Sequence, residues 1–226
     1  MSKHLERDLE ALEQNLLAQS SIVERMILRA CQSITEQRTD LIPLLLQDED
    51  TINRGEVLIE EECLKMLALH QPVAVDLRRV ATVLKINGDL ERIADLAVNL
   101  GERAQALVHF PRFRFPDHLE DMVEVATSMV RDSLDAFVRL DVELAHEVCL
   151  RDDQVDELNR QTIDDLQNLV VNNSAEIEPA WQYFSASRHV ERIADHATNI
   201  AEDVIYLVDG EIARHRHEDL SFYRMG

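Results

Sequence analysis

Apolar residues recur at alternating spacings of three and four positions along six stretches of the chain. This period is typical of amphipathic α-helices, because it places apolar side chains on one face of each helix. In the first stretch, residues 5–36, the apolar positions are Leu9, Leu12, Leu16, Val23, Ile27, Ala30 and Ile34. The pattern predicts six helices, over about residues 5–36, 40–69, 72–109, 117–139, 141–171 and 179–209.

Helix-capping residues stand between these stretches. Thr39 or Asp40 can cap the second helix, and Pro43 fits its first turn. Asp117 and Asp141 can cap the fourth and fifth helices in the same way. The connections are therefore short, which makes neighbouring helices antiparallel.

Prolines mark the larger boundaries. Pro72 and Pro179 can open the third and sixth helices, and two prolines make residues 111–116 the clearest linker. The chain then divides into a first three-helix repeat over residues 1–110, the linker over 111–116, a second repeat over 117–210 and a flexible tail over 211–226.

One segment is written twice, one hundred residues apart. The sequence Glu-Arg-Ile-Ala-Asp stands at residues 91–95 and again at 191–195. Over residues 91–102, eight of the twelve positions are identical to their counterparts. A match of this length indicates two copies of one helical unit.

Both copies also carry the same apolar stripe. Ile86, Leu90, Ile93 and Ala97 follow a 4-3-4 spacing, and Val190, Ile193 and Ala197 repeat it. Such stripes are the core positions of packed antiparallel helices. We therefore predict an all-α fold of two repeated antiparallel three-helix bundles that form a six-helix body.

Composition narrows the class of function. The formal net charge is −21, which disfavours nucleic acid and anionic membrane surfaces, because both are bound through Lys and Arg. The chain has 3 cysteines at wide spacing and no CxxC pair, so a thiolate zinc site is not expected. The charged first residues do not resemble a signal peptide, and no apolar run reaches the length of a membrane span. We expect a cytoplasmic protein without membrane insertion.

The repeated segment places acids on the face opposite its apolar stripe. Glu91 and Asp95 are four residues apart, so they lie on one side of the helix, and Glu191 and Asp195 repeat the pair. Like charges at this spacing destabilise a helix by a few tenths of a kcal/mol. A solvated face is the ordinary explanation for one such pair, but its recurrence in register favours a cation site.

The second helix of each repeat supplies a matching pair. Glu49 and Asn53 align with Asp152 and Asp156 at an offset that a three-residue difference in the intervening turn explains. Carboxylate and amide oxygens are ligands of hard cations. The candidate metal ligands are Glu49, Asn53, Glu91 and Asp95 in the first copy and Asp152, Asp156, Glu191 and Asp195 in the second.

The sequence offers little support for a known type of catalytic site. A di-iron helical bundle needs two Glu-x-x-His motifs, and only Glu143 to His146 forms one. No HExxH, GxSxG, P-loop or GxGxxG string occurs. A metal-dependent helical-bundle enzyme and a purely structural protein with solvated acid faces both remain open as alternatives.

The residues that recur also resemble a known family. Residues 71–78, 85–86, 89–99 and 191–202 resemble the motifs of PhoU, the phosphate-transport accessory proteins of bacteria. The resemblance covers nearly the whole chain. It implies two three-helix bundles and no catalysis. It also implies regulation of phosphate uptake and of the phosphate-starvation response, through the ATPase subunit of a phosphate ABC importer and a sensor histidine kinase.

The same resemblance bears on the acid faces. Some PhoU proteins carry metal clusters on Glu/Asp-x-x-x-Asp motifs, and many form dimers. It implies that the eight candidates hold a divalent or trivalent metal, such as iron or zinc, and that the chain forms a homodimer. Asn53 departs from this pattern, because an amide is a weaker ligand than the carboxylate of Asp156. The first site should be the weaker of the two.

Overall fold

The computed structural model describes residues 3–114 and 116–210, and the predicted flexible tail over 211–226 lies outside this range. Two three-residue 3-10 turns precede the second and sixth helices, at Thr39–Leu41 and Ser174–Glu176. The described ranges contain six α-helices: α1 (Lys3–Thr35), α2 (Ile42–His70), α3 (Ala74–Leu107), α4 (His118–Arg139), α5 (Val142–Asn172) and α6 (Ile177–Asp209).

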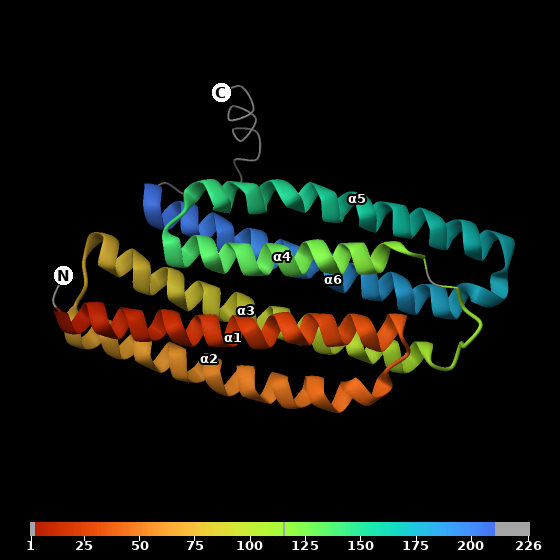
Figure 1. The fold of residues 1–226 in the computed structure, drawn as a ribbon, viewed down its shortest axis with the longest axis horizontal. Coiled ribbons are helices and arrows are strands. Elements are labelled where there is room, and N and C mark those ends of the chain that lie inside the picture. The colour runs from red at the N-terminus through yellow and green to blue at the C-terminus, as the bar shows by residue number, and fades with distance from the viewer. Residues whose placement is uncertain (1–2, 115, 211–226) are drawn as a thin grey trace, which may run out of the picture.

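The helices form two three-helix bundles side by side. Helices α1, α2 and α3 make the first bundle, and α4, α5 and α6 make the second (Figure 1). The most extensive contact between any two helices joins α3 to α6, which run antiparallel through the centre of the molecule. The predicted all-α fold of two repeated bundles is confirmed.

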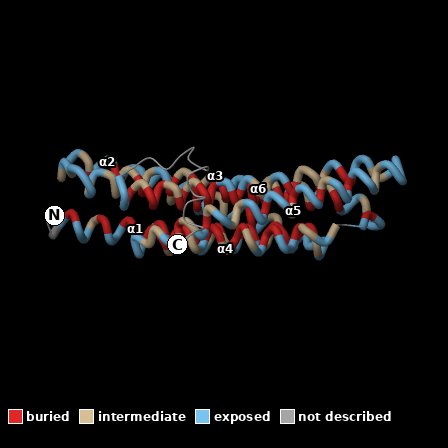
Figure 2. The backbone as a smooth tube through the Cα atoms, turned by 90° about the horizontal axis from the view of Figure 1, so that it is seen from above, coloured by how far each residue is buried: buried red, intermediate tan, exposed pale blue. Residues whose placement is uncertain are grey.

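The repeated apolar stripe is the centre of the core. Ile86, Leu90 and Ile93 have no exposed surface, and neither do Val190 and Ile193. Figure 2 shows the buried positions along the inner sides of the helices, with exposed positions outward. The two stripes meet across α3 and α6, so one continuous core joins the two bundles.

Polar contacts fix the register of α3 against α6. His196 Nδ1 lies 2.8 Å from Asp89 Oδ1, and both side chains are about nine-tenths buried. One turn away, Lys85 Nζ donates to Asp203 Oδ1 over 2.8 Å. A shift of one residue would separate both pairs, and it is disfavoured because the carboxylates of Asp89 and Asp203 are buried.

Two of the predicted caps differ from the structure. Helix α2 begins at Ile42 after Leu41, without a side-chain cap, because Thr39 and Asp40 belong to the preceding 3-10 turn. The carboxylate of Asp40 instead accepts from Arg38 Nε over 2.8 Å. Asp117 precedes α4 but makes no capping hydrogen bond. The cap at Asp141 is confirmed, since its side chain accepts from the backbone N–H of Leu144 over 3.0 Å.

The starts of the third and sixth helices also shift by a few residues. Helix α3 begins at Ala74, two residues after Pro72, because Gln71 takes a left-handed conformation (φ 45°) that ends α2. Helix α6 begins at Ile177, so Pro179 lies inside its first turn rather than at its start. A proline is accommodated there because the first N–H groups of a helix have no intrahelical partner.

The two bundles differ most in their first helices. Helix α1 has 33 residues and α4 has 22. The start of α1 lies against the α2–α3 corner, where Asp8 Oδ2 is 3.2 Å from His70 Nε2. Helix α4 starts further inward, so the α5–α6 corner projects beyond it (Figure 1). Within the described residues, no helix is both long and apolar enough to cross a membrane.

Candidate functional site

The first acid set lies where α2 and α3 face each other. Glu49 and Asn53 come from α2, and Glu91 and Asp95 come from α3. Burial raises the pKa of Glu49, and the nearby negative charge of Asp95 raises it further. The charge of Glu49 contributes in turn to the raised pKa of Glu91. These mutual effects show that the fold brings the acids of α2 and α3 close together.

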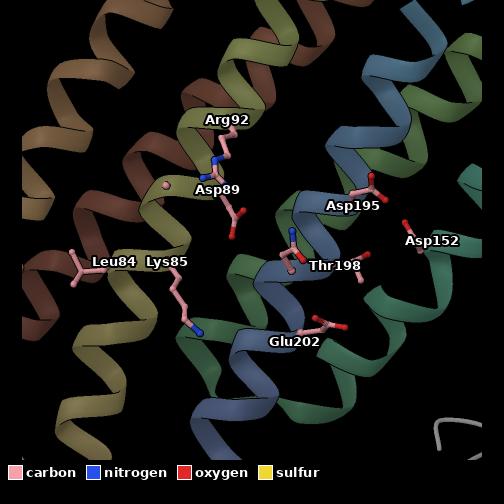
Figure 3. Close-up of a pocket in the computed structure, with 10 residues that line it drawn as sticks. Leu84, Lys85, Asp89, Arg92, Asp152, Asp195, Thr198 and Glu202 are labelled. Carbon is pink, nitrogen blue, oxygen red and sulfur yellow. The ribbon is translucent and has the colours of Figure 1, made fainter. Parts of the chain in front are cut away.

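The second acid set lies at the equivalent place between α5 and α6. Burial, followed by the charges of Asp195 and Asp156, raises the pKa of Asp152 to about 6. Burial also raises the pKa of Glu191 and of Asp195. Figure 3 shows Asp152 and Asp195 pointing toward one another from neighbouring helices. Carboxylates gathered in this way repel one another, so a positive charge placed among them would be stabilised.

Two oxygens of the second set lack hydrogen-bond partners among the described residues. Asp152 Oδ1 and Glu191 Oε2 are buried, and no donor in this part of the chain bonds to either. The other oxygen of Glu191 accepts from Arg188, one turn earlier on α6. A buried acceptor without a partner costs about 1–3 kcal/mol, so both oxygens are suited to take a ligand.

The geometry of the acid sets is open. Across residues 3–114 and 116–210, no three His, Cys, Asp or Glu side chains converge closely enough to hold one metal ion. The donor chemistry nevertheless suits a hard cation, because every donor in the second set is a carboxylate and two of its oxygens are unsatisfied. The first set has an exposed amide, Asn53, in place of the fourth carboxylate.

Further acids belong to the first set that sequence reasoning did not include. Glu102 is among the charges that raise the pKa of Glu49, after burial and Asp95. Glu56 acts on Glu91 in the same way, after burial and Asp95. Glu56 follows Asn53 by three residues on α2, so helical spacing was a signal that could have found it.

Arg92 and Arg192 partly offset the negative charge of the carboxylates beside them. Arg92 opposes the rise in the pKa of Glu91 that burial, Asp95 and Glu56 cause. Arg192 likewise opposes the rise in the pKa of Asp195. Both arginines are exposed, so their effect is partly screened by water.

The second acid set opens into a polar pocket of about 650 Å³ between α3 and α6 (Figure 3). Gly88 lines this pocket, and a Cβ atom added to it would meet no atom within 4 Å. Close packing against neighbouring side chains therefore does not require a glycine at this position. The lining residues are Leu84, Lys85, Gly88, Asp89, Arg92, Asp152, Asp195, Thr198, Asn199 and Glu202.

Comparison with known proteins identifies the class to which this paired-bundle fold with two acid sets belongs. A family model described as the PhoU domain matches the chain twice, over residues 16–104 and 119–204. The chain belongs to the PhoU family. The two matches correspond to the two bundles, each of which carries one acid set.

Individual relatives match over nearly their full lengths. A curated phosphate-specific transport system accessory protein PhoU homolog from Aquifex aeolicus is 38% identical over 211 residues, covering 93% of this chain and 96% of the relative. The crystal structure of PhoU from Pseudomonas aeruginosa superposes with a TM-score of 0.87 at 34% identity, over 91% of this chain and 99% of that one. The phosphate transport system regulatory protein PhoU from Streptococcus pneumoniae gives the same TM-score at 27% identity, over 92% and 99%.

Proposed function

We propose that this chain is a non-catalytic regulator of phosphate uptake and of the phosphate-starvation response. In this role it links the ATPase subunit of a phosphate ABC importer to a sensor histidine kinase on the cytoplasmic side of the membrane. The observation that carries the proposal is the double match to the PhoU domain, together with full-length relatives named as phosphate transport accessory proteins.

The form of the molecule supports an adaptor. Six long helices and a continuous core make a rigid body, and a net charge of −21 suits contact with basic surfaces of other proteins. A regulator of this kind changes the conformational equilibrium of its partner only by binding one state of that partner more tightly than another. The proposal includes a homodimer, which would present two such bodies to the importer and the kinase.

We further propose that the acid sets hold a divalent or trivalent metal. In the second copy, Asp152, Asp156, Glu191 and Asp195 would supply the oxygens, and the unsatisfied atoms of Asp152 and Glu191 support this role. A bound cation would supply positive charge that offsets the repulsion among the acids. The residues themselves would then tie two helices of a bundle together. The first copy, with Glu49, Asn53, Glu91 and Asp95, would bind more weakly.

Elemental analysis tests the metal component. The untagged protein is compared with the Asp95→Ala/Asp195→Ala double variant after identical purification. We expect bound metal in the native protein and a loss of most of it in the variant, with helical content unchanged by circular dichroism. Equal metal content in both proteins, or none in either, would reduce the acid sets to solvated faces.

Complementation tests the regulatory component separately. The chain is expressed in a bacterial host whose own PhoU is deleted, with a phosphate-starvation reporter and uptake of radiolabelled phosphate as readouts. We expect restored repression of the reporter in high phosphate. A well-folded, well-expressed protein that restores neither readout would contradict the regulatory role, whatever its metal content.

The alternative of a metal-dependent enzyme makes a different prediction. Each acid set consists of carboxylates, with one amide in the first copy, and neither includes a histidine. Such a set suits a hard cation more than a redox centre. The same purified, metal-analysed protein can be assayed for phosphatase and oxidase activity, and metal-dependent turnover would replace the regulatory proposal by the enzymatic one.

A further inference from the structure

An apolar groove of about 620 Å³ lies between α5 and α6 near the corner where the two helices meet. Its most exposed apolar members are Val171, Trp181 and Ile177, with exposed fractions of 85%, 65% and 55%. The indole of Trp181 packs against the ring of Phe184, and the two ring centroids are 5.5 Å apart. Large apolar side chains gathered at this exposure are typical of a surface that another molecule covers.

The groove continues the second acid set along the same two helices. On α6, residues 177, 181, 184, 188, 191 and 195 follow one another at spacings of four and three, so they form one stripe. On α5, residues 170, 167, 163, 160, 156 and 152 do the same in the opposite direction. The α5–α6 seam, defined by these twelve positions, is therefore apolar at the corner and acidic about two to three turns further on.

The acidic end of the seam keeps an excess of negative charge. Two arginines lie between its ends, but Arg188 is paired with Glu191 and Arg160 with Glu157. Asp152 Oδ1 and Glu191 Oε2 are buried, and neither has a hydrogen-bond partner within residues 3–114 and 116–210. Basic side chains reaching this end would satisfy these oxygens and relieve the repulsion that, after burial, raises the pKa of Asp152.

A second copy of the chain is a poor occupant of this seam. An isologous contact would place the same patch against itself, so acidic ends would face each other or lie against the apolar groove. Like charges across an interface cost binding energy. Charge complementarity instead selects a partner that is apolar at one end and basic at the other.

We propose that the α5–α6 seam is a docking site for an amphipathic helix of another protein, with apolar side chains at i, i+3, i+4 and i+7 over the Trp181 groove and Lys or Arg two turns further on, over the second acid set. An amphipathic helix that binds in a hydrophobic groove places apolar side chains at this spacing in the groove. This inference deepens the proposed adaptor role by giving the partner's chemistry. It does not require a metal, because basic side chains take the place of the cation.

The chain carries its own reporter for this test, because Trp181 is its 1 tryptophan. The probe is a synthetic helical peptide of about 18 residues, long enough to span both ends of the seam. It has Lys in its first two turns and Leu at the spacing above in its last two turns, and it contains no aromatic residue. Titrations are done with a chelator present, so that the outcome is independent of metal binding.

We expect a saturable blue shift of Trp181 emission with this peptide. The same peptide with Glu in place of Lys, or with Ala in place of Leu, should bind at least about tenfold more weakly. The Val171→Asp/Ile177→Asp variant should lose about tenfold or more in affinity, and so should Asp156→Asn/Asp195→Asn. The matched control Leu69→Asp alters a side chain that is 70% exposed at the corner of the first bundle, and it should bind as the native protein does.

Other outcomes overturn the proposal. Equal binding of the Lys and Glu peptides would remove the role of the acids, and equal binding by the Val171→Asp/Ile177→Asp variant would place the peptide elsewhere. An emission shift that depends on protein concentration without peptide, and that follows dimerisation in sedimentation, would make the seam an interface between two copies. No shift with any peptide, in a protein that circular dichroism shows to be folded, would also refute it.

Discussion

The two bundles are copies of one design, and they differ in how strongly each concentrates negative charge. The second copy gathers four carboxylates and raises the pKa of Asp152 to about 6, chiefly through burial and then through Asp195. The first copy replaces one of these carboxylates with Asn53, and its Glu49 shows the same direction of shift with burial as the main cause. The duplicated helices, α3 and α6, therefore keep the position of the acid set, whereas the neighbouring helices, α2 and α5, determine how much negative charge it holds.

The corners of the bundles differ in a second way. At the α5–α6 corner Trp181 stands in the groove, whereas its repeat counterpart in the first bundle is Ala81. The first bundle has the longer first helix, which reaches its α2–α3 corner. Trp181 is 65% exposed, so the α5–α6 corner presents a large aromatic side chain at a position where the first bundle has only a methyl group.

The largest expected effect concerns the extended start of α1. Leu12 is 2% exposed in the core of the first bundle. Leu12→Ala should lower the free energy of unfolding by about 3 kcal/mol, because it removes buried methyl groups and leaves a cavity. Chemical denaturation measures the change. Leu28→Ala, at a position on the same helix that is 47% exposed, is the control and should cost less than about 0.5 kcal/mol. A loss for Leu12→Ala as small as that for Leu28→Ala would mean that the start of α1 does not support the bundle.

Exchange of the residue that distinguishes the acid sets should exchange their affinities. Asn53→Asp should raise the affinity of the first set for Mn²⁺ about tenfold, since a charged oxygen replaces a neutral one. Asp156→Asn should weaken the second set by a similar factor. Isothermal titration calorimetry of the two variants and the native protein measures both changes. Unaltered affinities in both variants would show that the α2 and α5 residues are not ligands.

Much of this architecture could be predicted from the sequence, because helical period and repetition are local signals. The duplicated segment located both acid pairs on the third helix of each bundle, and helical spacing located Glu49 and Asp152 on the second. Their proximity in space depends on how α2 faces α3 and α5 faces α6. Periodicity does not specify that arrangement. In the folded structure the charge of Asp195 raises the pKa of Asp152, which shows that the two residues lie close together.

Other features could not be predicted because they depend on distant parts of the chain. The pairing of Asp89 with His196 joins residues from different bundles, and no local pattern indicates it. The cap expected at Asp40 failed for a related reason, since Arg38 binds that carboxylate in competition with the helix terminus. The α5–α6 seam combines one face of α5 with one face of α6, so it depends on how the two helices pack.

The raised pKa of Asp152 predicts a pH dependence that separates the two copies. Because the folded-state pKa of about 6 exceeds the ordinary aspartate value of 3.8, the folded protein holds this proton more tightly than the unfolded chain. The free energy of unfolding should therefore fall as the pH rises through this window. Asp152→Asn should remove the loss and stabilise the metal-free protein by about 1 kcal/mol at pH 8, allowing for solvent screening of a half-buried group.

Thermal or urea unfolding between pH 4 and pH 8, with a chelator present, measures this effect. The variant should match the native protein near pH 4, where Asp152 is protonated in the folded state, and exceed it above pH 6. Asp153→Asn removes a charge from the exposed neighbouring position and controls for net charge. A native protein that gains stability from pH 4 to pH 8 relative to the Asp152→Asn variant would contradict the sign of the shift.

The smallest expected effect lies at Gly88, in the first copy, where the second copy has Arg188. A Cβ at Gly88 would meet no atom within 4 Å, and a glycine inside a helix is less stable than alanine by about 1 kcal/mol. Gly88→Ala should therefore raise the free energy of unfolding by about 0.5–1 kcal/mol. Gly101→Ala on the same helix is the contrasting variant, because its Cβ would lie 2.7 Å from Leu45 Cδ1 and force that side chain to move. If Gly88→Ala destabilised the protein instead, the polar pocket beside α3 would need the glycine for a reason other than space, and the difference from Arg188 would mark a functional divergence between the two copies.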